Sequence, residues 1–297
     1  MEFFAFPGQG SHAPGMGRRL ASRFPAADDL LCSVEMETGV AVRELMWESP
    51  VDVLTRTENA QPAIVALSLA ALEAWRTVAT RTCPDWVSGH SVGSLAAAVA
   101  SGSLTPAEGV RLARRRGEIM ATAPGDGRML AVAVASDEAS RSLTELAEHF
   151  ELDLACFNGP RQIVLAGASK DIAAARRQLG ARSAELKVSH AFHSRLMDPV
   201  VPSWKDALAA VRFQDPQTPY LSSRTGQLVV SGDRIRSDLA RGIREPVRWD
   251  LVSHKAALCQ RGTILGSGAS LLRMWRGSPI ASTTTVVDDN FTVVAHA

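Results

Sequence analysis

The chain has 297 residues, 46% of them hydrophobic, and a formal net charge of +1, so it can bury a large core as one domain or as one domain carrying an insertion. The balanced charge argues against a nucleic-acid surface, no apolar run approaches the ~18 residues that cross a bilayer, and the first residues lack a signal sequence. Without a membrane span or a signal sequence, we expect a cytoplasmic protein. The four cysteines form no Cys-x-x-Cys pair, which argues against a zinc knuckle or a disulfide framework, so we expect reduced thiols.

In the N-terminal part, short apolar segments alternate with helical patterns. The run Phe3–Phe6 predicts a buried strand that stops at the loop 7–10. Helical spacing of apolar residues follows in four segments, at about 16–24, 26–38, 41–47 and 61–76. A short strand at 86–87 then leads into a helix over 95–100, and Pro106 opens a helix that runs to about 121. This alternation predicts an α/β fold.

From about residue 127 the pattern changes. We predict, in order, a strand at 129–135, a helix at 136–149, strands at 152–157 and 162–166, a helix at 169–179 and a strand at 184–188. The order βαββαβ is ferredoxin-like. We therefore expect a small subdomain, 127–190, inserted into a large part formed by 1–126 and 191–297, with the ligand site in the cleft between them. The tail after Ser278 is predicted to be loosely attached.

The segment Gly89-His90-Ser91-Val92-Gly93 carries the clearest chemical signal. A serine at the centre of Gly-x-Ser-x-Gly, between a strand and an alanine-rich helix, is typical of a nucleophile elbow. The two glycines allow the sharp turn, and the start of the helix points N–H groups at any anion that forms there. The alternative is a glycine-flanked helix cap in which Ser91 only bonds an N–H group.

Six further segments occur in the chain: Gly8-Gln9-Gly10-Ser11-His12, Asn59-Ala60-Gln61-Pro62-Ala63, Arg116-Gly117-Glu118-Ile119-Met120, Asn158-Gly159-Pro160-Arg161-Gln162-Ile163-Val164, His190-Ala191-Phe192-His193-Ser194 and Pro246-Val247-Arg248-Trp249. Together with the elbow, and in this order, they resemble the malonyl-CoA:acyl-carrier-protein transacylases and the acyltransferase domains of polyketide and fatty-acid synthases. That resemblance implies an α/β-hydrolase-like core with a ferredoxin-like insertion, in agreement with the predicted elements.

A serine hydroxyl is a weak nucleophile at neutral pH and needs a base, for which histidine has a suitable pKa. The resemblance assigns this role to His193. It also implies that a main-chain carbonyl near 242–245 orients the imidazole, and Asp198 is not favoured because it is too near in sequence. We expect His90, inside the elbow, to be structural.

Acyl transfer also needs two donors for the tetrahedral oxyanion. The backbone N–H groups of Val92 and Gln9 are the candidates, the first by its place after the nucleophile and the second by the resemblance. A malonyl group carries a free carboxylate, which a guanidinium can bind through two parallel hydrogen bonds. Arg116 occupies the position of the arginine in the family that the sequence resembles.

The resemblance extends to the substrate and its surroundings. Bulky Phe192 would crowd an α-methyl branch and disfavour methylmalonyl groups. Gln61, Asn158 and His190 are further candidate substrate-binding residues. The implied partners are malonyl-CoA and an acyl carrier protein, with no metal, no tightly bound cofactor and a monomeric chain. The implied reaction passes the malonyl group through a Ser91 ester to a phosphopantetheine thiol.

Two positions depart from the family pattern. Ser94 stands where the family usually has glutamate, and Gly266-Ser267-Gly268 replaces an acidic residue before Gly-Pro-Gly. These changes favour a dedicated pathway enzyme and leave two alternatives with the same Ser91 and His193: a transferase for a different acyl group, or an editing hydrolase. A non-catalytic carrier-binding subunit is the third alternative.

Overall fold

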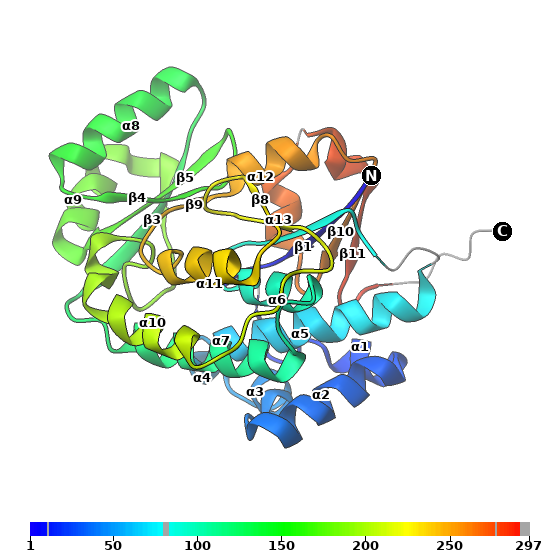
Figure 1. The fold of residues 1–297 in the computed structure, drawn as a ribbon. Helices are drawn as coiled ribbons and strands as arrows, with labels where there is room; N and C mark the ends of the chain where they lie inside the picture. The colour runs from blue at the N-terminus through cyan, green and yellow to red at the C-terminus, as the bar shows by residue number, and fades with distance from the viewer. Residues whose placement is uncertain (11, 80–82, 277, 292–297) are drawn as a thin grey trace.

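The computed structural model describes residues 1–10, 12–79, 83–276 and 278–291, and there the chain forms an α/β fold with two mixed sheets (Figure 1). The larger sheet has the order β11-β10-β1-β2-β7-β8. Its strands are β1 (Glu2–Phe6), β2 (Trp86–Gly89), β7 (Tyr220–Leu221), β8 (Leu228–Val229), β10 (Arg261–Leu265) and β11 (Thr284–Val287). Among the described strand pairs of this larger sheet, only β7 and β8 run antiparallel. Strand β1 lies between two parallel neighbours and is buried along its whole length, as is usual for inner strands of parallel sheets whose two faces are both covered, and its continuous apolar sequence fits this position.

The second sheet has the order β6-β3-β5-β4-β9. Its strands are β3 (Gly127–Ala133), β4 (Asp153–Phe157), β5 (Gln162–Ala168), β6 (Ser183–Glu185) and β9 (Val247–Arg248). The neighbours β6-β3, β3-β5 and β5-β4 are antiparallel, whereas β9 joins β4 in parallel. The predicted strand 184–188 is too long at its C-terminal end, because β6 ends at Glu185. The Leu186 N–H still donates to the Met129 carbonyl of β3, and the chain then turns so that Leu186 and Val188 line a cavity.

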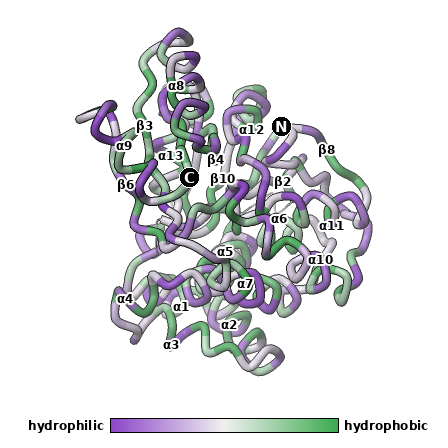
Figure 2. Tube along the Cα trace, turned by 90° about the vertical axis from the view of Figure 1, so that its left-hand side faces the viewer, coloured by the Kyte–Doolittle hydropathy of each residue, from purple (hydrophilic) through white to green (hydrophobic). Residues whose placement is uncertain are grey.

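The helices of the N-terminal part are α1 (Arg18–Arg23), α2 (Pro25–Thr38), α3 (Val42–Trp47), α4 (Val51–Leu54), α5 (Thr57–Val78), α6 (Gly93–Ala100) and α7 (Pro106–Ala121). Those that follow are α8 (Asp137–His149), α9 (Ser169–Leu179), α10 (Val201–Ala209), α11 (Gly232–Arg241), α12 (Trp249–Ala256) and α13 (Ala269–Met274), with short 3₁₀ turns at 180–182, 195–200 and 279–283. Hydrophobic and hydrophilic residues alternate along the outer helices, as expected for helices with one buried face (Figure 2). None of the helices in the described ranges has the length and apolarity needed to cross a membrane.

Helix α5 begins one turn earlier than predicted. The sequence prediction begins at Gln61, whereas α5 begins at Thr57. In the structure Pro62 lies inside the helix, and the Glu58 carbonyl that its N–H would have bonded accepts a hydrogen bond from Arg114 Nη1 of α7, at 3.3 Å. A contact between helices therefore replaces the lost bond.

The prediction of a loosely attached tail is wrong for residues 278–291, whereas residues 292–297 lie outside the described ranges. Strand β11 pairs in parallel with β10 at the edge of the larger sheet. Phe291 is buried, with its ring 6.0 Å from those of Phe24 and Trp75. The Asp289 carboxylate accepts hydrogen bonds from the N–H groups of Gly17 and Leu20, at 2.6 and 2.9 Å. The tail thus supplies the cap for α1, whose own N-cap residue, Gly17, has no side chain to do so.

Replacing Asp289 by Ala should lower the free energy of unfolding by about 1 kcal/mol, the usual effect of removing a helix cap. Chemical denaturation of the purified protein measures this change. The matched control is Asp288→Ala, because Asp288 accepts its side-chain hydrogen bond locally, from the Asn290 N–H. An equal effect of the two substitutions would contradict the capping role of Asp289.

Candidate active site

The predicted strand, turn and helix around Ser91 are confirmed. Strand β2 ends at Gly89, Ser91 has a left-handed φ of 51°, and α6 begins at Gly93. A Cβ atom on Gly89 would lie 2.0 Å from the Gly93 carbonyl group, and one on Gly93 would lie 2.3 Å from the Phe6 carbonyl oxygen. Both positions therefore require glycine, because the backbone of the turn packs directly against its own next residues and against the backbone of β1. The strained φ at Ser91 is typical of a nucleophile held on a sharp turn.

Ser91 lies in hydrogen-bond contact with His193. Ser91 Oγ and His193 Nε2 are 2.8 Å apart, and His193 Nδ1 lies 3.1 Å from the Glu245 carbonyl oxygen. Since a carbonyl can only accept, Nδ1 carries the proton and Nε2 is free to accept one from the serine hydroxyl. The expected main-chain carbonyl near 242–245 is thereby confirmed, and Asp198 instead pairs with Arg244.

The environment of His193 favours its neutral form. Burial lowers the pKa of His193 to about 3, and the nearby Arg116 cation and the His90 side chain act in the same direction. Hydrogen bonds to the backbone at Glu245 and Gly242 oppose this change only in part. A histidine with this pKa remains an available proton acceptor throughout the neutral range.

Arg116 enters the same site from α7. Its side chain is buried, and Nη1 donates a hydrogen bond to Gln61 Oε1 at 2.8 Å, while Gln61 Nε2 donates to Thr57 Oγ1. Burial lowers the pKa of Arg116 to about 10, and no carboxylate of the described chain forms an ion pair with it. Gly117 allows α5 and α7 to approach closely here, because a Cβ at this position would lie 2.6 Å from Glu58 Cα. The result is a buried guanidinium whose partner is a neutral amide.

The two candidate oxyanion donors flank the nucleophile. Val92 follows Ser91 at the start of α6, and Gln9 lies in the loop after β1, where Gly8 packs so tightly that a Cβ would be 2.6 Å from the His90 carbonyl oxygen. Within the described ranges, neither the Gln9 N–H nor the Val92 N–H donates a hydrogen bond to the protein. Both N–H groups are therefore available to a bound oxyanion.

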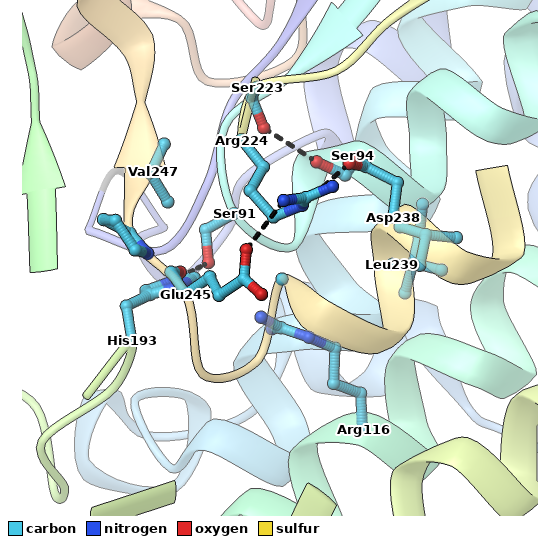
Figure 3. Close-up of a pocket in the computed structure, with 13 residues that line it drawn as sticks. Ser91, Ser94, Arg116, His193, Ser223, Arg224, Asp238, Leu239, Glu245 and Val247 are labelled. Carbon is cyan, nitrogen blue, oxygen red and sulfur yellow. Dashed lines mark hydrogen bonds and ion pairs between the residues drawn. The ribbon is translucent and has the colours of Figure 1, made fainter. Parts of the chain in front are cut away.

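Two cavities meet at Ser91, Arg116 and His193. The larger, of about 500 Å³, lies between the two sheets and is also lined by Gln9, Phe192 and Asn158. The smaller, of about 20 Å³, lies on the other side of the Ser91–His193 pair, towards α6 and α11 (Figure 3). Its remaining lining residues are Ser94, Leu95, Ser223, Arg224, Asp238, Leu239, Gly242, Glu245, Pro246 and Val247.

The other candidate residues differ in their placement. Asn158 lines the larger cavity, but its side chain bonds His90 Nε2 at 2.8 Å, which agrees with a structural role for His90. Gln61 lies behind Arg116 and contacts the site through it. His190 is absent from the lining of both cavities, and its ring stacks against Phe192 at 6.1 Å between centroids.

The sequence predictions missed the ion pairs that Arg224 makes with Asp238 and Glu245 in the smaller cavity. Arg224 Nε lies 3.0 Å from Asp238 Oδ1, and Arg224 Nη1 lies 2.7 Å from Glu245 Oε2 (Figure 3). Ser94, one of the two departures from the family pattern, lines this cavity and donates a hydrogen bond to the Gly89 carbonyl at 2.8 Å. No local motif marks Arg224 or Asp238, because residues from separate segments meet only in the folded chain.

Comparison with known proteins identifies the family. The sequence model described as "Acyl transferase domain" matches residues 3–265. The chain belongs to this acyl transferase family. It is 35% identical over 255 residues to the malonyl CoA-acyl carrier protein transacylase of Bacillus subtilis, covering 83% of this chain and 80% of that protein.

Two further proteins that the chain resembles differ in how much of their length it covers. It is 39% identical over 233 residues to a type I polyketide synthase of phenolphthiocerol synthesis from Mycobacterium marinum, covering 75% of this chain but only 11% of the synthase. The crystal structure of an acyl-carrier-protein S-malonyltransferase from Bartonella henselae superposes with a TM-score of 0.89 at 30% identity, covering 96% of this chain and 95% of that one.

Proposed function

We propose that this acyltransferase moves a malonyl group from CoA, through an ester on Ser91, to the phosphopantetheine thiol of an acyl carrier protein. The observation that carries the proposal is Arg116, a buried cation beside the Ser91–His193 pair with no carboxylate partner in the described chain. A buried charge is costly without a counter-charge, and the free carboxylate of a malonyl group would supply it with two-pronged geometry.

The relatives point in the same direction. The Bacillus protein is named for malonyl CoA and acyl carrier protein, and the Mycobacterium protein for polyketide synthesis. We therefore assign this chain to polyketide or fatty-acid biosynthesis.

In the acylation step, His193 Nε2 takes the proton of the Ser91 hydroxyl while Oγ attacks the thioester carbon. The N–H groups of Gln9 and Val92 hold the oxyanion, and the loss of one such donor typically costs about 3 kcal/mol of barrier. Collapse of the tetrahedral intermediate breaks the C–S bond, and the departing CoA thiolate takes the proton from His193. The malonyl-serine ester remains, with its carboxylate on Arg116.

In the second step, the phosphopantetheine thiol of the carrier gives its proton to His193 Nε2 and attacks the ester carbon. The C–O bond to Ser91 breaks, and the serine recovers its proton from His193. The same pair thus serves both steps, as a ping-pong reaction requires.

We assign acyl-group selection to Phe192, whose buried side chain lines the larger cavity and would crowd an α-methyl branch. Such crowding is worth about 1–3 kcal/mol, so methylmalonyl-CoA should be a poorer substrate rather than an excluded one. In this assignment Gln61 acts by holding Arg116, Asn158 by holding His90, and His190 through its stacking on Phe192.

We also assign the fold to an α/β-hydrolase-like core, 1–126 and 191–297, with a ferredoxin-like insertion at 127–190. The strand order β6-β3-β5-β4 with antiparallel neighbours supports the insertion. Its own hydrophobic cluster, built from residues between Leu130 and Leu179, supports a separate subdomain.

Intact-protein mass spectrometry after mixing with malonyl-CoA, methylmalonyl-CoA or acetyl-CoA tests the proposal. We expect a malonyl-sized adduct that is lost when pantetheine is added as the acceptor thiol, with malonyl-pantetheine as the product. Release of free malonate without transfer would favour an editing hydrolase. The absence of any malonyl adduct on a folded protein would refute the proposed substrate.

The pKa of His193 predicts an unusual pH dependence. Because the base must be neutral and its pKa in the free enzyme is about 3, kcat/KM for acylation should stay level from pH 8 to pH 5. A histidine with the ordinary pKa of about 6.5 would lose about 30-fold over the same range. Acylation rates with malonyl-CoA at pH 5, 6, 7 and 8 measure this, and a midpoint between pH 6 and 7 would contradict the assigned environment.

A further inference from the structure

The smaller cavity contains charged side chains that the proposed reaction does not use. Arg224 follows β7, Asp238 lies in α11, and Glu245 precedes β9, so three separate segments meet there. Figure 3 shows the Arg224 guanidinium between the two carboxylates, on the side of Ser91 that faces α6 and α11. All three residues line the cavity that also contains Arg116 and His193.

One end of this network is anchored in the protein interior. Asp238 is 7% exposed and accepts hydrogen bonds from Ser222 Oγ at 2.7 Å and from Arg224 Nε at 3.0 Å. Burial raises the pKa of the Asp238 carboxyl, and the nearby Arg224 cation opposes that change. A buried carboxylate needs such a counter-charge, so Asp238 holds Arg224 in place.

The other end reaches the residue that orients the catalytic base. Glu245 binds Arg224 through its carboxylate, at 2.7 Å, and binds His193 Nδ1 through its backbone carbonyl, at 3.1 Å. The carbonyl selects the tautomer of His193 and the direction of its ring. The ion pair between Arg224 and the Glu245 side chain therefore restrains the segment that carries this carbonyl.

The Glu245 carboxylate is also a potential competitor for Arg116. Both side chains line the same cavity, yet the ion pairs of Glu245 are with Arg224, at 2.7 Å, and Arg241, at 3.9 Å. Without Arg224 this carboxylate would keep only the long contact to Arg241, whose side chain is 59% exposed, and would compete with the substrate for the Arg116 guanidinium. Arg224 thus keeps the acyl-binding cation available.

We propose that Arg224 is a positioning residue for the acylation step, holding Glu245 so that its backbone carbonyl orients His193 and its carboxylate stays away from Arg116. The part that concerns Arg116 rests on the proposed malonyl substrate. The part that concerns His193 applies to any acyl group that Ser91 accepts.

The test compares rates of covalent acylation by malonyl-CoA and acetyl-CoA. Arg224→Met should slow both reactions, because His193 loses its orientation, and should slow malonyl transfer by about tenfold more, because the freed Glu245 carboxylate occupies Arg116. Adding Glu245→Gln to Arg224→Met should return the malonyl-to-acetyl rate ratio to within about threefold of the original protein. A merely structural role of Arg224 predicts no such restoration.

Two companion variants address folding, because Arg224→Met leaves Asp238 buried without a cation. Arg224→Met with Asp238→Asn removes that charge, and Arg224→Lys keeps it but lacks the second prong that reaches Glu245. Both should show the same changed rate ratio.

Unchanged acylation rates in folded Arg224 variants, or a rate ratio that Glu245→Gln does not restore, would overturn the proposal. An original protein without a malonyl adduct would instead refute the proposed substrate. The acetyl rates would then still decide whether Arg224 orients His193.

Discussion

Replacing Ser91 by Ala should abolish the acyl adduct and lower acyl transfer at least about a thousandfold, the scale of loss seen when a serine nucleophile is removed. The physical reason is that, in the described chain, the Ser91 hydroxyl is the one that forms a hydrogen bond with His193 Nε2. Intact mass after mixing with malonyl-CoA and the rate of malonyl transfer to pantetheine measure the two effects.

The matched control for Ser91→Ala is Ser101→Ala, at the other end of α6. Ser101 Oγ donates only to a carbonyl and a serine hydroxyl away from both cavities, so its variant should retain the adduct. A Ser91→Ala protein that still acquires the malonyl group would remove Ser91 from the mechanism.

Replacing Arg116 by Ala should lower the rate of acylation by malonyl-CoA about a hundredfold, which corresponds to ~2.8 kcal/mol and to the loss of charge-assisted hydrogen bonds to a buried carboxylate. Acetyl-CoA has no such carboxylate, so its acylation rate should remain within about threefold of the original. Parallel measurements of kcat/KM with the two thioesters give this change in selectivity.

The neighbouring Arg115 provides the control for Arg116. Its side chain is 57% exposed and pairs with Glu118 on the helix surface, so Arg115→Ala should leave both rates unchanged. Equal losses with malonyl-CoA and acetyl-CoA in Arg116→Ala would contradict carboxylate recognition. Full malonyl activity in that variant would favour a different acyl substrate.

Features that depend on local sterics could be predicted from the sequence. The turn at Ser91 needs glycine on both sides because carbonyl groups lie where a Cβ would be. Pro106 opens α7, and Thr105 and Glu108 complete a capping box there. The order of strands and helices between 127 and 185 also follows from short-range hydrophobic periodicity, although the ends of β3, β5 and β6 differ by two or three residues.

Features that depend on long-range contacts could not be predicted from the sequence. The start of α5 was predicted four residues too late, and in the structure the Glu58 carbonyl that Pro62 cannot bond accepts a hydrogen bond from Arg114 of another helix. The attachment of the tail depends on Asp289 and Phe291 meeting residues more than two hundred positions away. A single sequence contains no local signal for either contact.

The sequence by itself determined the candidate nucleophile, base and carboxylate-binding arginine, because Ser91, His193 and Arg116 lie in segments whose residue types and order carry the chemistry. Only the tertiary structure decided how these groups act together. It buries His193 and so lowers the pKa of the base, and it buries Arg116 without a carboxylate partner in the described chain. It also joins Arg224, Asp238 and Glu245 behind the base. Burial and charge pairing are properties of groups brought together from distant segments, and they arise only when the chain has folded.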